Sequence, residues 1–494
     1  MGLFKHDARV IKFDVLRKVA DLTYDNDGEI SEEELNNYYK DLIPGTKANY
    51  RCCVYKEREI LRQRGRLVRG KMANDVETNN PRQIVQVIEA ACDGCTIKKI
   101  MVTDNCRKCL AKACMGSCNF GAITMGENRA VIDYDKCKEC GACARNCPYH
   151  AIVVTERPCK AACPVDAITW RDDNIAIIDE NKCINCGRCV AACPFGAIED
   201  ISWIVPVIKD IKAGKKMIAM VAPAIQGQFE GVSLRQIKEG ILKLGFSDVV
   251  EVALGADVVA KNEYQELKEH KKEGKPLTTS CCPGFVNMAK IHFPKVYKEN
   301  MSTMVSPMMA RAAMIKEKDP DAEIVFIGPC LAKKQEAMEK HTNVDYVLTF
   351  EELAAMFISR HIYLKEVEQT KDDAKWEASP YGRNFAQGGG VSKAVIEAAK
   401  EAGDEGLTSY YADGAMDCKK QLLLMNIGRF NFDILEGMCC DGGCINGPCG
   451  ISDAKDVRKR MNEENVNEKT LIKEALENSG VDDSKLNIHV HKEV

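Results

Sequence analysis

Short apolar runs alternate with amphipathic stretches from about residue 201 to the end of the chain. Continuous apolar runs of this kind are typical of strands in parallel sheets, where helices cover both faces. The predicted strands are residues 217–221, 249–254, 324–327, 346–348 and 432–435. A helix is predicted over residues 262–272, between the second and third of these runs. The pattern therefore predicts a C-terminal α/β domain over residues 201–494.

Several conspicuous residues directly follow these predicted strands. Pro223 comes just after the first run, Cys330 after the third and Met438 after the last. Ligands of open α/β sheets gather at the carboxyl ends of the strands. The sequence therefore places a candidate binding site at this edge of the domain.

Residues 91–200 have a different pattern, with four copies of one very short apolar strand, each just after a cysteine. The copies are residues 121–123, 151–153, 167–169 and 196–198. Internal repeats indicate repeated structural units. The region is therefore predicted to be a separate α+β domain made of similar modules.

Residues 1–90 are polar and are predicted to form a helical segment. Ser31 and Glu34 have the spacing of a helix capping box. Residues 25–34 also partly match a calcium-binding loop, although Thr23 stands where the first acidic ligand would be. An arginine-rich helix follows, which is either a docking face for an acidic partner or, as the default, a solvated face; its arginines are Arg58, Arg62, Arg64, Arg66 and Arg69.

Composition narrows the functional class. The chain has 494 residues, enough for two or three domains, and its 69 basic residues nearly balance its 73 acidic ones. This balance argues against a nucleic-acid surface or a polybasic membrane patch. There is no apolar run of the roughly 18–20 residues that would span a bilayer, and the first residues carry no signal-peptide core. A cytoplasmic protein without nucleic-acid or membrane partners is expected.

Of the 26 cysteines, 16 lie within residues 92–193 in closely spaced groups. In a reducing compartment such spacing indicates metal binding rather than disulfides. Residues 137–148 and 183–194 are both C-x2-C-x2-C-x3-C-P runs, in which three cysteines hold one [4Fe–4S] cube and the fourth holds a neighbouring cube. Structural zinc is the alternative, but zinc sites usually consist of two separated C-x2-C pairs.

The long segment between the two complete runs argues against pairing them with each other. Pairing each run with the cysteines just before it gives two tandem ferredoxin-like modules, each holding two cubes. The predicted ligand sets are Cys106, Cys109, Cys114 and Cys147; Cys118, Cys137, Cys140 and Cys143; Cys163, Cys183, Cys186 and Cys189; and Cys92, Cys95, Cys159 and Cys193. The last set depends on Cys92 and Cys95 as donors, so three to four accessory cubes are expected.

Three further cysteine loops lie in the α/β domain, at residues 279–283, 329–333 and 436–444. Their thiolates could close one more cube, because a cube requires four soft ligands. A second cysteine beside a ligand, a lysine three residues after another and a glycine-rich last loop are more than a plain cube requires. The surplus indicates a cluster with another group attached.

These loops, TSCCP, PCLAK and EGMCCDGGC, resemble the signature motifs of the iron-only (FeFe) hydrogenases. The similarity runs from about Pro223 to Gly450, and the iron–sulfur region before it also fits that family. The resemblance implies two parallel sheets around a buried H-cluster, a [4Fe–4S] cube joined to a diiron unit with carbon monoxide, cyanide and a bridging dithiolate. The implied ligands of this cube are Cys282, Cys330, Cys440 and Cys444, the last of which also bridges to the diiron unit.

The resemblance also implies roles for other residues. Lys333 would donate a hydrogen bond to a cyanide, Pro223 and Ala224 would face the other diatomic ligands, and Phe385 and Met438 would line the pocket. A proton relay would begin at the Cys281 thiol and continue through Glu266, Ser302 and Glu263, with the pKa of the buried glutamates raised. The family relay ends in an arginine where this chain has His270, which leaves the surface end of the relay open.

Three positions depart from the family pattern and suggest a less-studied branch. Phe285 replaces the usual tryptophan, Gly328 replaces the usual methionine, and the last loop reads Gly-Pro-Cys-Gly at residues 447–450. The glycine run at 387–390 is not a dinucleotide fingerprint and predicts a close backbone approach instead.

The predicted function is the reversible reduction of protons to hydrogen. Ferredoxin or flavodoxin would supply electrons through the cubes, and hydrogenase maturation proteins would install the diiron unit. Two alternatives remain: a hydrogen or redox sensor of the same family, and a non-enzymatic iron–sulfur carrier or assembly protein that lacks the diiron unit.

Overall fold

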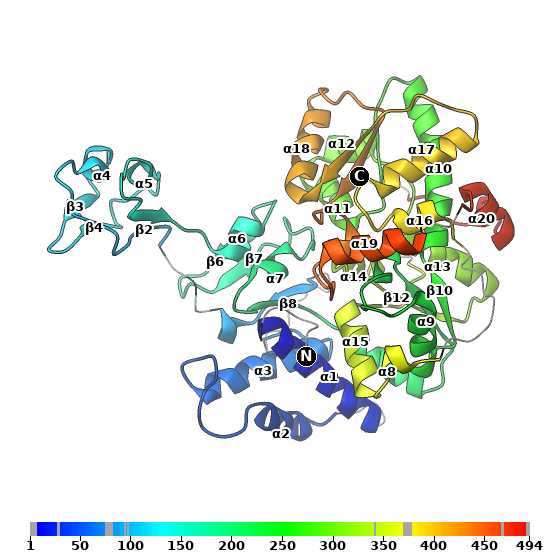
Figure 1. Cartoon of the computed structure of the whole chain (residues 1–494), viewed down its shortest axis with the longest axis horizontal. Coiled ribbons are helices and arrows are strands. Elements are labelled where there is room, and N and C mark those ends of the chain that lie inside the picture. Colours follow the sequence, from blue (N-terminus) through cyan, green and yellow to red (C-terminus); the bar gives the residue numbers. More distant parts are fainter. Residues whose placement is uncertain are drawn as a thin grey trace.

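The computed structural model describes residues 7–26, 30–74, 83–92, 95, 98–339, 342–368, 378–465 and 469–490. These residues form a large α/β body, two small cysteine-rich modules and a group of N-terminal helices packed against the body (Figure 1). Within these ranges, no helix combines the length and the apolar character needed to cross a membrane.

Two parallel sheets form the centre of the body. The first has the strand order β10-β9-β12-β13 and the second has the order β11-β15-β14, with every neighbouring pair parallel. The strands are β9 (Met217–Val221), β10 (Asp248–Glu251), β11 (Leu277–Thr278), β12 (Glu323–Ile327), β13 (Tyr346–Leu348), β14 (Ser409–Asp413) and β15 (Ile434–Met438). The predicted α/β domain with two parallel sheets is therefore confirmed.

The five predicted strands differ from the structure mainly at their ends, while β11 and β14 were not predicted. Residues 217–221 and 346–348 match β9 and β13, and 324–327 lie within β12. The run 249–254 was predicted too long, because the chain turns into a helix at Ala253. The last run was placed too early: β15 begins at Ile434 and continues to Met438 through Glu436, a buried acid that interrupts the apolar pattern.

Helices cover the sheets and separate them. They are η2 (Pro223–Ile225), α8 (Ile204–Lys212), α9 (Leu234–Lys243), α10 (Ala253–Lys272), α11 (Pro283–His292), α12 (Pro294–Asn300), α13 (Pro307–Lys318), α14 (Ala332–Ala337), α15 (Phe350–Ser359), α16 (Pro380–Asn384), α17 (Gly390–Glu401), α18 (Gly414–Asn426), α19 (Ala454–Asn465) and α20 (Ile472–Ser479). The buried helix α10 packs against α13, α16 and α17. Small residues at its start allow this close packing, since a Cβ atom on Gly255 would collide with the Pro307 carbonyl.

The two cysteine-rich modules share one plan. The second module contains α6 (Pro158–Ala162), α7 (Arg188–Ala192), the hairpin β6 (Ile168–Trp170)–β7 (Ala176–Ile178) and the antiparallel pair β1 (Val85–Val87)–β8 (Ile198–Asp200). The first contains α4 (Ala113–Gly116), α5 (Ala142–Arg145), β3 (Ile123–Met125)–β4 (Ala130–Ile132) and β2 (Ile100–Val102)–β5 (Ile152–Val154). The four repeated strands predicted from the sequence are β3, β5, β6 and β8.

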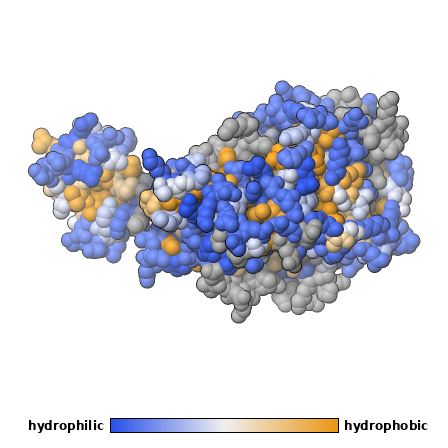
Figure 2. Space-filling view, turned by 90° about the horizontal axis from the view of Figure 1, so that it is seen from below, coloured by the Kyte–Doolittle hydropathy of each residue, from blue (hydrophilic) through white to orange (hydrophobic). Residues whose placement is uncertain are grey.

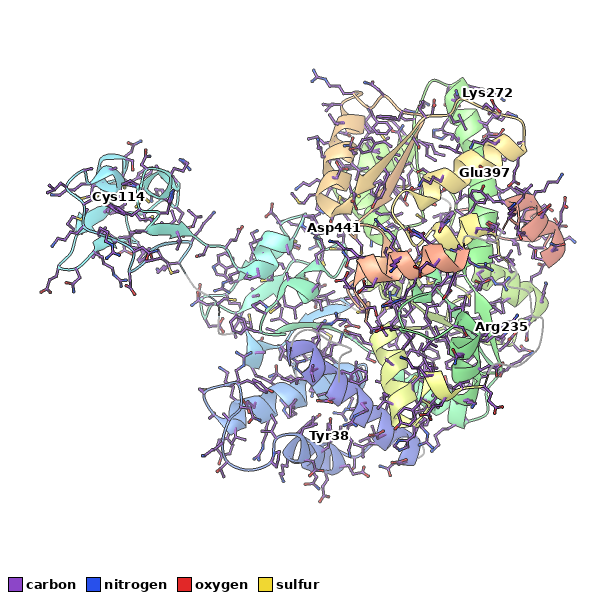
Figure 3. All side chains as sticks on the ribbon, in the orientation of Figure 1. Tyr38, Cys114, Arg235, Lys272, Glu397 and Asp441 are labelled. Atoms are coloured by element: carbon purple, nitrogen blue, oxygen red, sulfur yellow. The ribbon has the colours of Figure 1, made fainter. Side chains whose placement is uncertain are left out.

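The first module is inserted into the second. Strand β1 precedes the predicted start of this region at residue 91, yet it pairs with β8 at the other end of it. The first module, residues 98–155, lies between them and stands away from the body in Figure 1 and as a separate lobe in Figure 2. Figure 3 places Cys114 in this lobe.

The N-terminal helices are part of the body rather than an independent domain. Helix α1 (Asp7–Asp25) packs against α15 and α8, and Val15 and Val19 belong to the same apolar core as β9 and β12. Helix α2 (Glu32–Leu42) begins with the predicted Ser31 capping box. Part of the alternative calcium loop, residues 27–29, lies outside the described residues.

Neither interpretation of the arginine-rich helix α3 (Val54–Val68) holds for its central residue. Arg64 is buried, pairs with Glu199 of β8 and donates to the Gly196 carbonyl. Arg58 donates to the carbonyls of Ile43 and Gly45. Arg64 therefore links the N-terminal helices to the second module, and Arg58 ties α3 to the segment that follows α2. Both arginines satisfy acceptors that would otherwise lack partners.

A buried ion network joins the N-terminal helix α1, the second cysteine-rich module and the α/β body. Lys12 of α1 lies 2.8 Å from both Asp200 and Glu351, and Lys334 of α14 lies 2.7 Å from Asp200 and 3.1 Å from Glu352. Burial alone would raise the pKa of Asp200, but the two ammonium groups outweigh it and lower that pKa. The network therefore ties the N-terminal helix and the second module to the cysteine loop that begins at residue 329.

Candidate functional site

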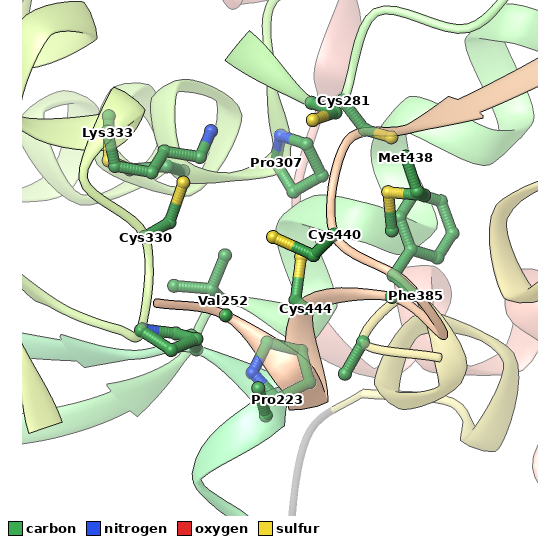
Figure 4. Close-up of a pocket in the computed structure, with 18 of the residues that line it drawn as sticks. Pro223, Val252, Cys281, Pro307, Cys330, Lys333, Phe385, Met438, Cys440 and Cys444 are labelled. Carbon is green, nitrogen blue, oxygen red and sulfur yellow. The ribbon is translucent and has the colours of Figure 1, made fainter. Parts of the chain in front are cut away.

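The three cysteine loops meet around one pocket (Figure 4). The loops leave β11, β12 and β15 at their carboxyl ends, where the sequence predicted the site. The four predicted ligands all line the pocket, namely Cys282, Cys330, Cys440 and Cys444. Parallel strands therefore bring thiols that are far apart in the sequence to one place.

All the predicted cofactor-contacting residues line the same pocket: Pro223, Ala224, Lys333, Phe385 and Met438. The Lys333 ammonium lies 2.7 Å from the Glu336 carboxylate, one helical turn further on. The sequence analysis missed several apolar wall residues, such as Val252, Pro307 and Phe326. No sequence signal distinguishes them from ordinary core residues.

The pocket thiols suit a soft metal cluster. Burial raises the pKa of Cys330 to about 11 and raises that of Cys440 well above its usual range. Cys282 differs, because a hydrogen bond from the Cys439 side chain, together with nearby backbone amides, outweighs burial and lowers its pKa to about 6. Four buried thiolates around the single Lys333 ammonium among the described residues of this pocket are costly, and metal coordination removes that cost. The donor set therefore fits an iron–sulfur cube.

The first module has two hollows, each lined by one predicted set of four cysteines. One is lined by Cys106, Cys109, Cys114 and Cys147. The other is lined by Cys118, Cys137, Cys140 and Cys143. Among the described residues, no three Cys, His, Asp or Glu side chains converge closely enough to hold one metal ion. Four cysteine sulfurs placed around a hollow can each bind one iron atom of a [4Fe–4S] cube.

The second module groups its cysteines in the same way. Cys189 interacts electrostatically first with Cys186, Cys183 and Cys163 and then with Cys159. Cys159 in turn interacts with Cys193, Cys95 and Cys92. Repeated N–H···S hydrogen bonds support the correspondence between modules: the Ala130 amide donates to Cys106 at 3.4 Å, and the Ala176 amide donates to Cys92 at 3.4 Å. Cys92 therefore occupies the place in the second module that Cys106 occupies in the first.

One ligand set of the second module adjoins the pocket. A Cβ atom built on Gly284 would lie 3.3 Å from the Cys439 sulfur and 3.7 Å from the Cys186 Cβ. Arg188 also forms an ion pair with Asp441, at 3.0 Å; Figure 3 labels Asp441 at this boundary. The set that contains Cys186 is thus separated from the Cys282–Cys440 loops only by packed side chains.

Buried polar residues lead away from the pocket at Cys281. Burial, followed by the nearby Glu263 carboxylate, raises the pKa of the Cys281 thiol well above its usual range. Glu263 is fully buried and accepts hydrogen bonds from the Ser280 amide at 2.9 Å and the Ser280 hydroxyl at 3.1 Å. Burial raises the pKa of Glu263 to about 8, and Ser302 interacts with the same carboxylate.

The two glutamates lie in the opposite order to the one predicted. Helix α10 begins at the pocket wall and ends at Lys272 on the surface (Figure 3). Glu263 comes earlier in this helix than Glu266 and is therefore nearer to Cys281. Glu266 lies further out and accepts hydrogen bonds from the amide of Thr303, at 3.1 Å to each oxygen, and from its hydroxyl.

The predicted close backbone approach at the glycine run is present. A Cβ atom on Gly388 would collide with the Tyr411 side chain. The buried Glu436 carboxylate accepts hydrogen bonds from the Gly389 amide at 2.9 Å and the Ser392 amide at 2.8 Å. Glu436 thereby fixes this segment against β15, which leads into the last cysteine loop.

Two departures from the family pattern have a local explanation. The Phe326 ring occupies the space that a side chain at position 328 would need, because a Cβ on Gly328 would collide with it. The buried Phe285 ring lies directly against Gly437 of β15 and leaves no room for a Cβ there.

Comparison with known proteins agrees with this geometry. The family model "Iron only hydrogenase large subunit, C-terminal domain" matches residues 215–448. The large subunit of the periplasmic [Fe] hydrogenase of Nitratidesulfovibrio vulgaris is 30% identical over 301 residues, which cover 50% of this chain and 71% of that protein. The chain belongs to the iron-only hydrogenase family. Models of a 4Fe-4S binding domain and of the LdpA Fe-S cluster-binding domain match residues 130–153 and 153–204.

Other members of the family differ in what their names describe. Iron hydrogenase 1 of Clostridium pasteurianum is 27% identical over 285 residues, which cover 47% of this chain and half the length of that protein. A probable cytosolic Fe-S cluster assembly factor of Brugia malayi is 26% identical over 277 residues, which cover 46% of this chain and 60% of that protein. Family membership and iron–sulfur binding are therefore established.

Proposed function

We propose that the chain is a hydrogenase that reversibly reduces protons to hydrogen. The observation that carries this proposal is the pocket itself, where four cysteines, Lys333 and the Cys281 thiol surround one cavity. A plain electron-carrying cube would need only the four cysteines. The remaining space and the additional polar groups fit a cube with a diiron unit attached.

In this proposal the protein positions and isolates the cofactor. Cys282, Cys330, Cys440 and Cys444 would hold the cube, and Lys333 would donate a hydrogen bond to a cyanide of the diiron unit. Apolar walls such as Phe326, Phe385 and Met438 would exclude water. The diiron unit, once installed by maturation proteins, would supply the redox chemistry of hydrogen.

Cys281 and the glutamates would move protons between the pocket and solvent. A thiol and a carboxyl that are both protonated near neutrality are suited to passing a proton without first creating a buried charge. Glu263 meets this condition, since burial raises its pKa to about 8.

Electrons would reach the pocket through the cubes. The ligand set around Cys186 adjoins the pocket, and the first module stands furthest from the body, where a ferredoxin or flavodoxin could reach it (Figure 1). We propose four accessory cubes with the ligand sets given above. The cytoplasmic location and the lack of nucleic-acid or membrane partners stay predictions.

The second candidate is a non-enzymatic iron–sulfur assembly protein, which a relative's name suggests. Such a protein needs no proton route from its cluster. A fully buried Glu263 beside Cys281 is costly to fold, and a proton route gives it a purpose. A sensor of the same family would retain the cofactor but catalyse the reaction slowly. The presence of the polar groups from Cys281 to Glu266 favours the enzyme.

Infrared spectroscopy of protein matured anaerobically with the diiron cofactor tests the proposal. Sharp metal carbonyl and cyanide bands that shift under hydrogen are expected. Full cube loading without these bands would favour the assembly protein. Cys281→Ala should keep the bands and lose most hydrogen evolution, whereas Cys52→Ser, an exposed cysteine on the N-terminal segment, should keep both. Near-normal hydrogen evolution in Cys281→Ala would contradict the proton route.

A further inference from the structure

The polar residues that begin at Cys281 continue past Glu266 to a histidine that the sequence analysis did not single out. The hydroxyl of Thr303 lies 2.9 Å from Nδ1 of His489 and donates to Glu266 on its other side. The same His489 nitrogen lies 3.7 Å from the Glu266 carboxylate. The His489 side chain is 51% exposed and that of Glu266 is 17% exposed, so the series ends in solvent at His489.

The protein chain holds His489 in this position. The segment that carries it lies antiparallel to residues 303–305, where the Val305 amide donates to the Ile488 carbonyl at 2.9 Å and the Val490 amide donates to the Thr303 carbonyl at 2.7 Å. The neighbouring Ile488 is buried in the apolar core around α10. The imidazole is therefore fixed by backbone pairing and core packing, with its ring at the surface.

We propose that His489 is the solvent-facing proton donor and acceptor of the relay, in the place that an arginine takes elsewhere in the family. This inference rests on the proposed hydrogenase function and extends the route from Glu266 to solvent. Histidine suits the task because it is the side chain whose charge ordinarily changes between pH 5 and 8.

The transfer balances without any further reagent. An imidazolium at His489 gives its Nδ1 proton to the Thr303 oxygen, and that hydroxyl gives its own proton to the Glu266 carboxylate. One N–H bond and one O–H bond break, and two O–H bonds form, leaving a neutral imidazole and a protonated Glu266. Nδ1 of the exposed His489 ring then takes a proton from a hydronium ion of the solvent, which leaves a water molecule. The reverse sequence releases a proton during hydrogen oxidation.

His270, which occupies the position of the family's arginine, is less well placed. Its Nδ1 is buried and has no hydrogen-bond partner among the described residues. Within the described part of the chain, Glu266 is the charged group that pairs with His489. The geometry therefore favours a route through the C-terminal segment over one along α10.

Deuterium exchange at Glu263 tests the route without the diiron unit. In full-length, cube-loaded protein, the carboxylic C=O infrared band of protonated Glu263 shifts when its proton is replaced after mixing with D2O, and Glu263→Gln identifies the band. A positioned acid–base group contributes roughly 10²–10⁴-fold, so His489→Asn should slow this exchange by at least about tenfold. Added imidazole should restore it. The control His361→Asn, at an exposed histidine beyond α15, should leave it unchanged.

Two results would overturn the inference: an unchanged exchange rate in His489→Asn, or a rate slowed by His270→Asn instead. In matured enzyme, His489→Asn should also lower hydrogen evolution, most of all at high pH where hydronium is scarce, and imidazole should again restore it. The exchange experiment reports on the proton route alone. Absent carbonyl and cyanide bands would instead count against the proposed function, so the two failures are distinguishable.

Discussion

Glu263 should remain protonated at neutral pH, and this state can be measured directly. The side chain is completely buried, and its second oxygen has no hydrogen-bond partner among the described residues. Its pKa rises from an ordinary 4.5 to about 8, chiefly through burial. At about 1.4 kcal/mol per pH unit, that change makes ionisation roughly 5 kcal/mol more costly in the folded protein.

The sign of the effect on stability follows from proton linkage. The folded state binds this proton more tightly than the unfolded chain, so its contribution to stability is complete below about pH 4.5 and is lost as the pH rises to about 8. Glu263→Gln removes the titration, while its amide oxygen can still accept from the Ser280 amide and hydroxyl. The stability of the variant relative to the parent should therefore increase by about 3 kcal/mol between pH 5.5 and 7.5.

Infrared difference spectra of parent minus Glu263→Gln, recorded from pH 5 to 10 on cube-loaded protein, provide the assay. A carboxylic C=O band that disappears with a midpoint near pH 8 is expected, and the melting temperatures of the two proteins should diverge from pH 5 up to about pH 8 and then stay a constant distance apart. An ionised Glu263 carboxylate band at every pH, or a midpoint near pH 4.5, would show that burial does not raise the pKa of Glu263. A flat difference in melting temperature would do so independently.

Three further predictions concern the scaffold and the clusters. Lys334→Met should lower the melting temperature by about 3–5 °C, because it removes the ammonium partner of Glu352 and leaves Asp200 with Lys12 alone, at a cost of roughly 3–5 kcal/mol, while Lys459→Met on the exposed face of α19 should have almost no effect. Gly388→Ala should reduce iron retention at the pocket through its collision with Tyr411, and adding Tyr411→Ala should restore it; failure to restore would exclude this cause. Cys95→Ala should lower the iron content of the full chain by about four atoms, one cube, and an unchanged iron count would show that Cys95 is not a ligand.

The sequence predicted the site well because its spacing is constrained by chemistry. A cube requires four thiolates, and a parallel sheet brings them to one edge, so the three cysteine loops indicated a cube. The family resemblance then selected Cys282, Cys330, Cys440 and Cys444, which line one pocket. The same constraint grouped the cysteines of the first module correctly around its two hollows. Strand positions in the body were found from apolar runs, with errors where Ala253 begins a helix or Glu436 lies inside a strand.

Features that depend on long-range packing could not be predicted in this way. The order of Glu263 and Glu266 depends on which end of α10 faces the pocket, and periodicity is the same in both directions. Arg64 belongs to a helix that is polar in sequence, yet its partner Glu199 lies in another module. His489 approaches Glu266 only because the C-terminal segment pairs with residues 303–305, and no local signal marks that pairing.

The nesting of one cysteine-rich module inside the other bears on how such a chain could be lengthened or shortened. Strands β2 and β5 are antiparallel neighbours, with Ile100 opposite Val154, so the first module leaves the second through two adjacent strands. A segment whose two ends lie side by side can be excised or exchanged without separating β1 from β8. The first module, residues 98–155, could therefore be removed or replaced by evolution or by design. Such a change would alter the number of cubes and the distance over which electrons travel, while the pocket and its proton route stay intact.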